Sequence, residues 1–125
     1  MPPFDLEVTA TVIVAGAIAS RDFMPVHHDR DYAQQQGAPD IFMNILTSNG
    51  YVSRYVTDWA GGDARLAKIS TRLGGPAVPG LPLHFRGQVV AESSRDGERG
   101  LDVQVRADND LGNHLTSSVR LSLPT

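Results

Sequence analysis

An aspartate and a histidine five residues apart are the side chains of this sequence best suited to acid–base chemistry. They are Asp22 and His27, within the run Asp-Phe-Met-Pro-Val-His-His-Asp. Pro25 lacks an N–H and forces the residue before it into extended geometry, so no α-helix can run through this segment. In a regular strand, an offset of five would place the two side chains on opposite faces. If they meet, the backbone is a shaped loop, and the converging carboxylate and imidazole can hold and deprotonate a water molecule.

A purely structural interpretation of the same run stays open. In it, Asp22 caps a turn, Pro25 shapes that turn, and the His-His-Asp sequence begins a solvated helix. A metal site is not expected, because adjacent imidazoles usually point apart and no further His or Cys stands at ligand spacing from His28.

The elements that must position these residues begin with a predicted strand and two predicted helices. After a loose lead-in over residues 1–6, apolar and polar residues alternate over 8–14, which predicts a strand, and from Ala15 the pattern also suits a helix. A short helix is predicted over 29–36. The longest predicted helix runs from an N-cap at Asp40 to Gly61. Its Thr-Ser-Asn-Gly centre indicates either a close-packed neighbour beside Gly50 or a tolerated polar face.

The second half of the chain predicts antiparallel strands. They cover 64–73, 83–91, 101–107 and a last strand in which alternate residues from Leu115 to Leu123 are mostly apolar, with connections at 94–100 and 108–113. His84 and His114 fall opposite the apolar positions, so we expect them at the surface. Strands segregated from a long helix argue for one α+β domain over residues 1–125, in which the helix packs on a curved antiparallel sheet.

Composition narrows the classes of function. The formal charge of −3 and the scattered arginines do not favour binding to nucleic acid or to an anionic membrane. The absence of cysteine excludes disulfides, thiolate metal ligands and a cysteine nucleophile. The N-terminus lacks the basic region of a signal peptide, and the longest apolar run, residues 12–19, is too short to span a bilayer. We therefore expect a cytoplasmic protein.

A longer pattern resembles a known family over nearly the whole chain. The run Ser-Arg-Asp-Phe-x-Pro-Val-His-x-Asp-x-x-Tyr-Ala, followed by Gly-x-Pro, a long helix and four strands, resembles a MaoC-like hot-dog domain. The segment 76–80 resembles the start of that family's long strand. The runs Val-His-His-Asp-Arg-Asp, Ile-Phe-Met-Asn-Ile-Leu-Thr and Arg-Tyr-Val-Thr-Asp-Trp-Ala-Gly are similar to the small MaoC-like subunit of steroid side-chain enoyl-CoA hydratases. The residues in register with the family's hydratase motif are Asp22, Pro25, His27, Asp29 and Ala33.

The resemblance implies a hot-dog fold and hydration of a 2-enoyl-CoA to the 3-hydroxyacyl-CoA, or the reverse dehydration, in steroid or fatty acyl side-chain degradation. Asp22 and His27 would hold the water, and no cofactor is implied beyond the coenzyme A of the substrate. A backbone N–H at the start of the central helix would stabilise the thioester oxygen. The family's His-Gly-Met matches Met43-Asn44-Ile45 here, so Asn44 replaces the glycine. Ser48 and Asn49 are weaker candidates for substrate contact, against the alternative of a satisfied polar pair within the helix.

The resemblance also implies an oligomer. Domains of this kind pair through their sheets and build the site between protomers, as a homodimer or as a heteromer with a second MaoC-like subunit. Two alternatives remain: a hot-dog acyl-CoA thioesterase, and a non-catalytic subunit that supports a catalytic partner. The presence of both Asp22 and His27 argues against the second, since a scaffold has no need of the pair.

Overall fold

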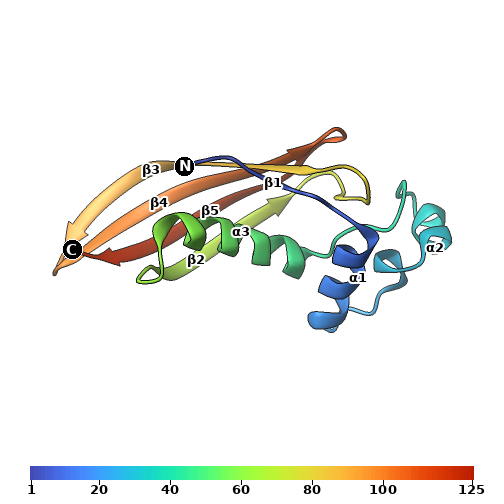
Figure 1. Cartoon of the computed structure of the whole chain (residues 1–125), viewed down its shortest axis with the longest axis horizontal. Helices are drawn as coiled ribbons and strands as arrows, with labels where there is room; N and C mark the ends of the chain where they lie inside the picture. The colour runs from blue at the N-terminus through green and yellow to red at the C-terminus, as the bar shows by residue number, and fades with distance from the viewer.

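A computed structural model describes residues 1–125 as one five-stranded antiparallel sheet curved around a long helix, α3 (Figure 1). The strand order is β1-β3-β4-β5-β2. The strands are β1 (Phe4–Leu6), β2 (Arg65–Leu73), β3 (Leu83–Arg95), β4 (Glu98–Asn109) and β5 (Gly112–Pro124). The helices are α1 (Ala10–Ala19), the 3₁₀ turn Pro25–His27, α2 (Arg30–Gln35) and α3 (Ile45–Ala60). This arrangement confirms the predicted α+β architecture, a long helix on a curved antiparallel sheet.

The inner face of the sheet and one side of α3 share a hydrophobic core. Cross-strand register places Leu101 opposite Leu121 and Val103 opposite Val119, and all four side chains are buried. On α3, Val52 and Val56 stand one helical turn apart on the face that packs against this surface. The alternation predicted for the last two strands is therefore confirmed, because one face of each strand is removed from water.

The N-terminal strand prediction is wrong. Thr9 accepts a hydrogen bond from the N–H of Val12 through its hydroxyl and so caps α1, which occupies most of the predicted strand. The only strand in this part of the chain, β1, lies in the expected lead-in, where Phe4 pairs with Phe85. An apolar run with few polar residues shows no clear period, so the cap decides between helix and strand here.

The long helix begins one turn later than predicted, because Asn44 rather than Asp40 is its N-cap. The carboxylate of Asp40 instead accepts from the N–H of the next residue, Ile41. The chain stays non-helical up to Asn44 because its N–H groups bond elsewhere: Phe42 donates to the carbonyl of Val26 and Met43 to the carbonyl of Ala77 (2.9 Å). This shift places Asn44 at the start of α3, beside the loop that carries Asp22.

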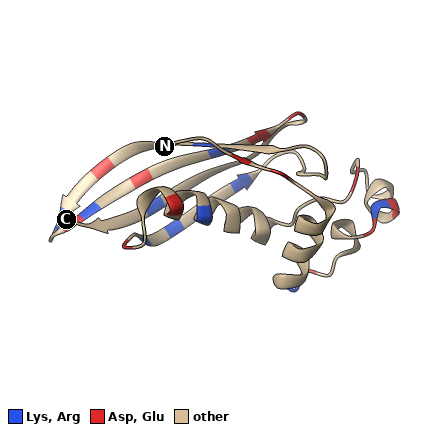
Figure 2. Ribbon diagram, viewed as in Figure 1, with Lys and Arg blue, Asp and Glu red and all other residues tan.

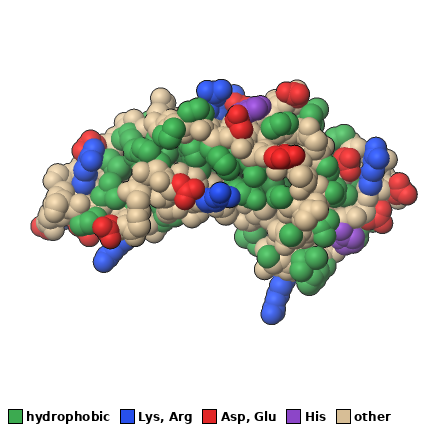
Figure 3. Space-filling view, viewed as in Figure 1, with side chains coloured by type: hydrophobic (Ala, Val, Ile, Leu, Met, Phe, Trp, Pro, Cys, Tyr) green, Lys and Arg blue, Asp and Glu red, His purple; other side chains and the backbone are tan.

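The shape of the molecule leaves one side open. Figure 3 shows an arch, hollowed between the far ends of the strands and the lobe that carries α1 and α2. Charged residues lie mostly on the strands, the turns and α2 (Figure 2), whereas the first half of α3 has none. None of the helices combines the length and apolar character that crossing a membrane requires.

Candidate active site

The end of α1 delivers Asp22 to the site. Two hydrogen bonds close the helix, from the N–H of Arg21 to the carbonyl of Ile18 and from the N–H of Asp22 to the carbonyl of Ala17. This is the Schellman pattern, whose left-handed position is usually a glycine. Here that position is Arg21, with φ of +56°, at a cost of about 1 kcal/mol for a residue with a side chain. The chain reverses sharply, and Asp22 follows directly.

Pro25 brings the histidine back toward Asp22. Met24 is extended, as the residue before a proline must be, and the N–H of His27 donates to the carbonyl of Met24, closing the 3₁₀ turn. Nε2 of His27 then lies 3.1 Å from Oδ2 of Asp22. The loop therefore joins the two side chains that sequence reasoning paired.

The tautomer of His27 follows from its second contact. Its Nδ1 lies 2.6 Å from the carbonyl oxygen of Phe42. A carbonyl only accepts, so Nδ1 carries a hydrogen, and in the neutral imidazole Nε2 is an acceptor. A carboxylate oxygen and an unprotonated nitrogen at 3.1 Å would repel each other. The pair is therefore favourable only when it holds one proton between the two groups. The His27 side chain is 8 % exposed and that of Asp22 27 %, so solvent reaches the pair from the side of Asp22.

Asn44 contributes its side chain as well as its backbone. Its amide donates to Oδ2 of Asp22 (3.2 Å) and to the hydroxyl of Ser20 (2.8 Å), and its Oδ1 accepts from the N–H of Thr47. The backbone N–H groups of Asn44, Ile45 and Leu46 make no hydrogen bond within the chain. They form the start of a 16-residue helix, where the helix dipole favours negative charge. The resemblance pointed to the backbone donor; the link from the side chain to Asp22 was missed.

Close contact between α1 and α3 aligns these groups. A Cβ added to Gly16 would lie 2.2 Å from Oγ1 of Thr47, so only glycine allows the helices to approach this closely. Gly50 has nothing within 4 Å of such a Cβ. The close-packed neighbour considered for Gly50 therefore does not exist within the chain.

The two weaker substrate candidates lie differently in the structure. Ser48 is fully buried, and its hydroxyl lies 2.9 Å from Nε2 of His114. Oδ1 of Asn49 is buried without any hydrogen-bond partner, the one such side-chain atom in the chain.

The surface position predicted for His114 is wrong, since its side chain is buried. The register between β4 and β5 slips at this residue: Ala107 pairs with Leu115 and Asp108 with Asn113, so His114 has no partner on β4. Such a bulge turns the side chain inward. His84, by contrast, lies on the outer face with Asp5, as predicted.

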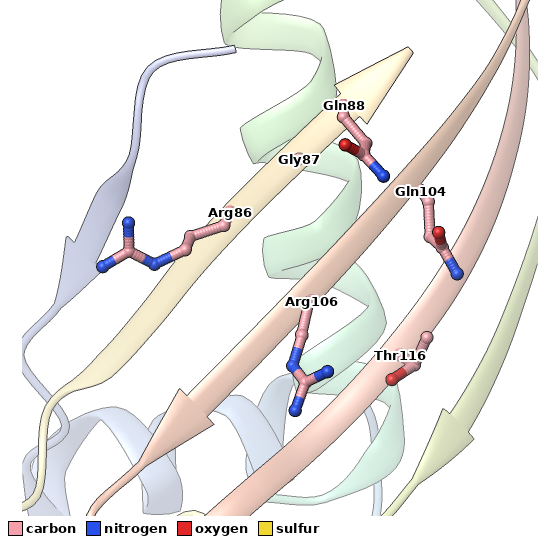
Figure 4. A pocket seen from close by; sticks show the side chains of 6 residues that line it. All are labelled: Arg86, Gly87, Gln88, Gln104, Arg106 and Thr116. Atoms are coloured by element: carbon pink, nitrogen blue, oxygen red, sulfur yellow. The ribbon is translucent and has the colours of Figure 1, made fainter. Parts of the chain in front are cut away.

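Two hollows in the surface differ in polarity and in their distance from the Asp22–His27 pair. A groove of about 340 Å³ runs between α1 and α3 and is lined mainly by apolar atoms, including those of Ala19, Leu46 and Tyr51. A polar hollow of about 290 Å³ lies on the outer face of the sheet, around Arg86 and Arg106 (Figure 4). The sheet separates this second hollow from α3, and no member of the site lines it. Of these two hollows, the groove between α1 and α3 is the one next to the candidate site, because Ser20 both lines the groove and accepts a hydrogen bond from Asn44.

Together the curved sheet and its central helix define a hot-dog domain, and the acid–imidazole pair beside the start of that helix is its candidate acid–base site. The chain belongs to the MaoC-like family: the family described as "MaoC like domain" matches residues 3–111.

Relatives of known sequence and structure agree with this assignment. The chain is 47 % identical to the beta subunit of 3-oxo-4,17-pregnadiene-20-carboxyl-CoA hydratase of Mycobacterium tuberculosis, over 98 % of this chain and 92 % of the relative. The crystal structure of the ChsH1-ChsH2 complex from the same organism contains a chain of 47 % identity that superposes with a TM-score of 0.91, covering 98 % and 94 % of the two chains. The (R)-hydratase of A. caviae involved in PHA biosynthesis superposes with a TM-score of 0.85 at 18 % identity, covering 98 % of this chain and 93 % of that one. This last likeness concerns the fold.

Proposed function

We propose that this chain is a subunit of an enoyl-CoA hydratase that adds water across the double bond of a 2-enoyl-CoA, with Asp22 and His27 as its catalytic pair. The observation that carries the proposal is the 3.1 Å contact between Nε2 of His27 and Oδ2 of Asp22, with the histidine tautomer fixed by Phe42. A steroid side chain is the proposed acyl group, because the 47 % identical relative is named for such a substrate.

The proton balance of hydration suits a pair that holds a single proton. Water loses one proton as its oxygen bonds to Cβ, and Cα gains one as the double bond is lost. When a water molecule lies against both side chains, one group accepts the first proton while the other donates the second. The pair still holds one proton afterwards, now on the other group, and passage of that proton across the 3.1 Å contact restores the starting state. No electrons are transferred, so the reaction needs no cofactor beyond the coenzyme A of the substrate.

Negative charge develops on the thioester oxygen as water adds, and the start of α3 is placed to receive it. We assign the backbone N–H of Asn44 to this oxygen, since it has no partner within the chain and lies in the residue that also binds Asp22. A preorganised donor of this kind commonly contributes 10²–10³ in rate. Asn49 stays the weaker candidate for substrate contact, since its unpaired Oδ1 is buried within the chain, and the contact of Ser48 with His114 gives Ser48 a supporting role.

The rest of the site is proposed to come from a second MaoC-like subunit. Large apolar side chains remain about half exposed or more around the loop and the start of α3, and a partner or an acyl group would cover them: Ile18, Phe23, Met24, Ile45 and Leu46. The related chain was crystallised as part of the ChsH1-ChsH2 complex, which supports a heteromer. An acyl-CoA substrate also favours a cytoplasmic location.

Adjacent histidines give a matched test. In the complex with its partner subunit, His27→Ala should lower kcat for enoyl-CoA hydration by about 10²–10⁴, whereas His28→Ala, an exposed neighbour, should leave it nearly unchanged. The assay follows loss of the enoyl thioester absorbance, with size-exclusion chromatography to show intact assembly. Full activity of His27→Ala would contradict the proposal. Release of free thiol from a saturated acyl-CoA would point to the thioesterase instead.

A further inference from the structure

A buried imidazole outside the catalytic pair links three separate parts of the fold. His114 lies 3 % exposed at the start of β5. Its Nδ1 lies 2.8 Å from the carbonyl oxygen of Gly75, and its Nε2 lies 2.9 Å from the hydroxyl of Ser48 on α3. Because a carbonyl only accepts, Nδ1 carries the hydrogen, and Nε2 accepts from the hydroxyl of Ser48. Both nitrogens of the neutral imidazole are satisfied.

The connection between β2 and β3, residues 74–82, carries Gly75 and also contacts the start of α3. Two residues after Gly75, the carbonyl of Ala77 accepts from the N–H of Met43 at 2.9 Å. The hydrogen bonds and the intervening backbone therefore form a closed circuit, here named the His114 clamp, through five residues: Met43, Ser48, Gly75, Ala77 and His114. Asn44 lies inside the circuit, directly after Met43 and one helical turn before Ser48.

The loop itself is anchored to β5. The N–H of Gly74 donates to the carbonyl of His114 (2.7 Å) and that of Gly75 to the carbonyl of Asn113 (2.8 Å). A Cβ on Gly74 would lie 2.4 Å from the backbone oxygen of Asn113, so this approach requires glycine. The hydrogen bonds of His114 and of this loop therefore fix the first turn of α3 relative to the sheet.

We propose that His114 is a positioning residue for the proposed hydration reaction, which fixes the backbone N–H of Asn44 where the thioester oxygen develops charge. This inference rests on the proposed function. Without the imidazole, Ser48 and Gly75 each lose a buried partner, and the loop that holds Met43 is free to shift. Small displacements of a preorganised donor reduce catalysis because the donor acts on charge that exists only in the transition state.

The test compares substitutions in the complex of this chain with its partner subunit. His114→Leu removes both links, Ser48→Ala removes one hydroxyl only, and His114→Gln offers an N–H to Gly75 and an oxygen to Ser48. His84→Leu is the matched control, since His84 is a strand histidine on the outer face, paired with Asp5. Two quantities are measured: hydrogen exchange of the Met43 amide, and the steady-state kinetics of enoyl-CoA hydration.

We expect faster exchange of the Met43 amide in His114→Leu and Ser48→Ala, with kcat reduced about tenfold or more in His114→Leu and KM changed by less than about threefold. His114→Gln should restore both exchange and kcat, which a requirement for apolar packing alone would not produce. Three results would overturn this role for His114. The Met43 amide could exchange at the wild-type rate in both His114→Leu and Ser48→Ala, or kcat could stay unchanged although that amide exchanges faster. The third is a His114→Gln protein as impaired as His114→Leu. If His114→Leu does not fold, the exchange rate and kcat of Ser48→Ala are compared with those of the wild type in its place. Failure of the wild-type complex to hydrate any enoyl-CoA would contradict the proposed function instead, and the exchange rates would still decide whether the clamp holds α3.

Discussion

At the scale of single residues, Asn44 has two separable duties. Its Oδ1 caps α3, and its amide nitrogen holds Oδ2 of Asp22 at 3.2 Å. Asn44→Asp keeps an oxygen for the cap but loses the donor and places a second carboxylate beside Asp22. Asn44→Ala loses both.

Asn44→Ala should therefore lower the free energy of unfolding by about 1 kcal/mol, whereas Asn44→Asp should lower it less. Hydration should fall further in Asn44→Asp, because the new carboxylate cannot donate to Oδ2 of Asp22 and repels it instead. Urea unfolding and steady-state kinetics of the two variants measure these effects. If Asn44→Ala and Asn44→Asp had the same free energy of unfolding and the same rate of hydration, the two duties of the side chain would not be separable.

The buried His114 also makes stability depend on pH. Burial lowers the pKa of His114 below its usual value of 6.5, and the hydrogen bond to Gly75 opposes that shift only in part. As pH falls below about 6.5, the unfolded chain binds a proton that the folded chain does not, so the free energy of unfolding falls until the lower, folded pKa is reached. Above about 6.5 the contribution of this residue is constant.

Urea unfolding between about pH 7.5 and 5 should show this loss in the wild type and a smaller loss in His114→Gln, which cannot titrate. If the free energy of unfolding fell equally with pH in the wild type and in His114→Gln, His114 would not contribute to the pH dependence of stability.

Residue types predicted part of the site, for physical reasons that differ from residue to residue. Pro25 forbids an α-helix, so a shaped loop between Asp22 and His27 could be anticipated from the sequence, whereas their convergence was only one of the two interpretations left open. The inward turn of His114 depends on a bulge in the pairing of β4 with β5, and strand alternation cannot show a bulge. The link from Asn44 to Asp22 spans 22 residues and depends on how α1 packs on α3.

At the scale of elements, two helix glycines have opposite surroundings. Gly16 meets Thr47 across the contact between α1 and α3, while Gly50 faces open space. Gly16→Ala should push α1 away from α3, displace Ser20 from Asn44, and lower both the free energy of unfolding and kcat. Gly50→Ala should raise the free energy of unfolding by about 0.5–1 kcal/mol, since alanine suits a helix interior better than glycine.

Thermal unfolding of the two variants beside the wild type checks this contrast. A Gly16→Ala protein as stable and as active as the wild type would contradict the close contact between the helices.

The elements differed in how well the sequence predicted them. Strands β4 and β5 contain the predicted ranges and bury one face over most of their length. Both extend further than predicted, so the expected connections 94–100 and 108–113 shrink to residues 96–97 and 110–111, because paired backbone groups continue the strands to the turns. The start of α3 was misplaced by one turn, because the N–H groups of residues 42 and 43 bond to Val26 and Ala77, which are far apart in sequence. For α1, the alternation over residues 8–14 wrongly favoured a strand; the helix begins after the cap at Thr9, and residues 12–19 are apolar enough to suit either element.

At the scale of the whole molecule, the sheet has an unpaired edge. β1 pairs with β3 only at Leu83–Phe85, so the remainder of that edge of β3 is uncovered, and Val89 and Val90 are exposed there. An uncovered strand edge pairs readily with another chain. We expect the second MaoC-like subunit to extend the sheet at this edge.

Val90→Lys should therefore weaken association with the partner, while Ser94→Lys, on the exposed end of the same strand, should have little effect. Sedimentation velocity of the mixed subunits measures the association. Equal association of the two variants would place the interface elsewhere.

The most direct measurement is hydration of a steroid-linked 2-enoyl-CoA in ¹⁸O-labelled water by this chain together with its partner subunit, with Asp22→Asn as the comparison. The 3.1 Å pair of Asp22 and His27 predicts one ¹⁸O atom in the new 3-hydroxyl group, an intact thioester, and almost no labelled product from Asp22→Asn. Label found in a free carboxylate, or labelled hydroxyl formed equally fast by Asp22→Asn, would contradict a hydratase that acts through this pair.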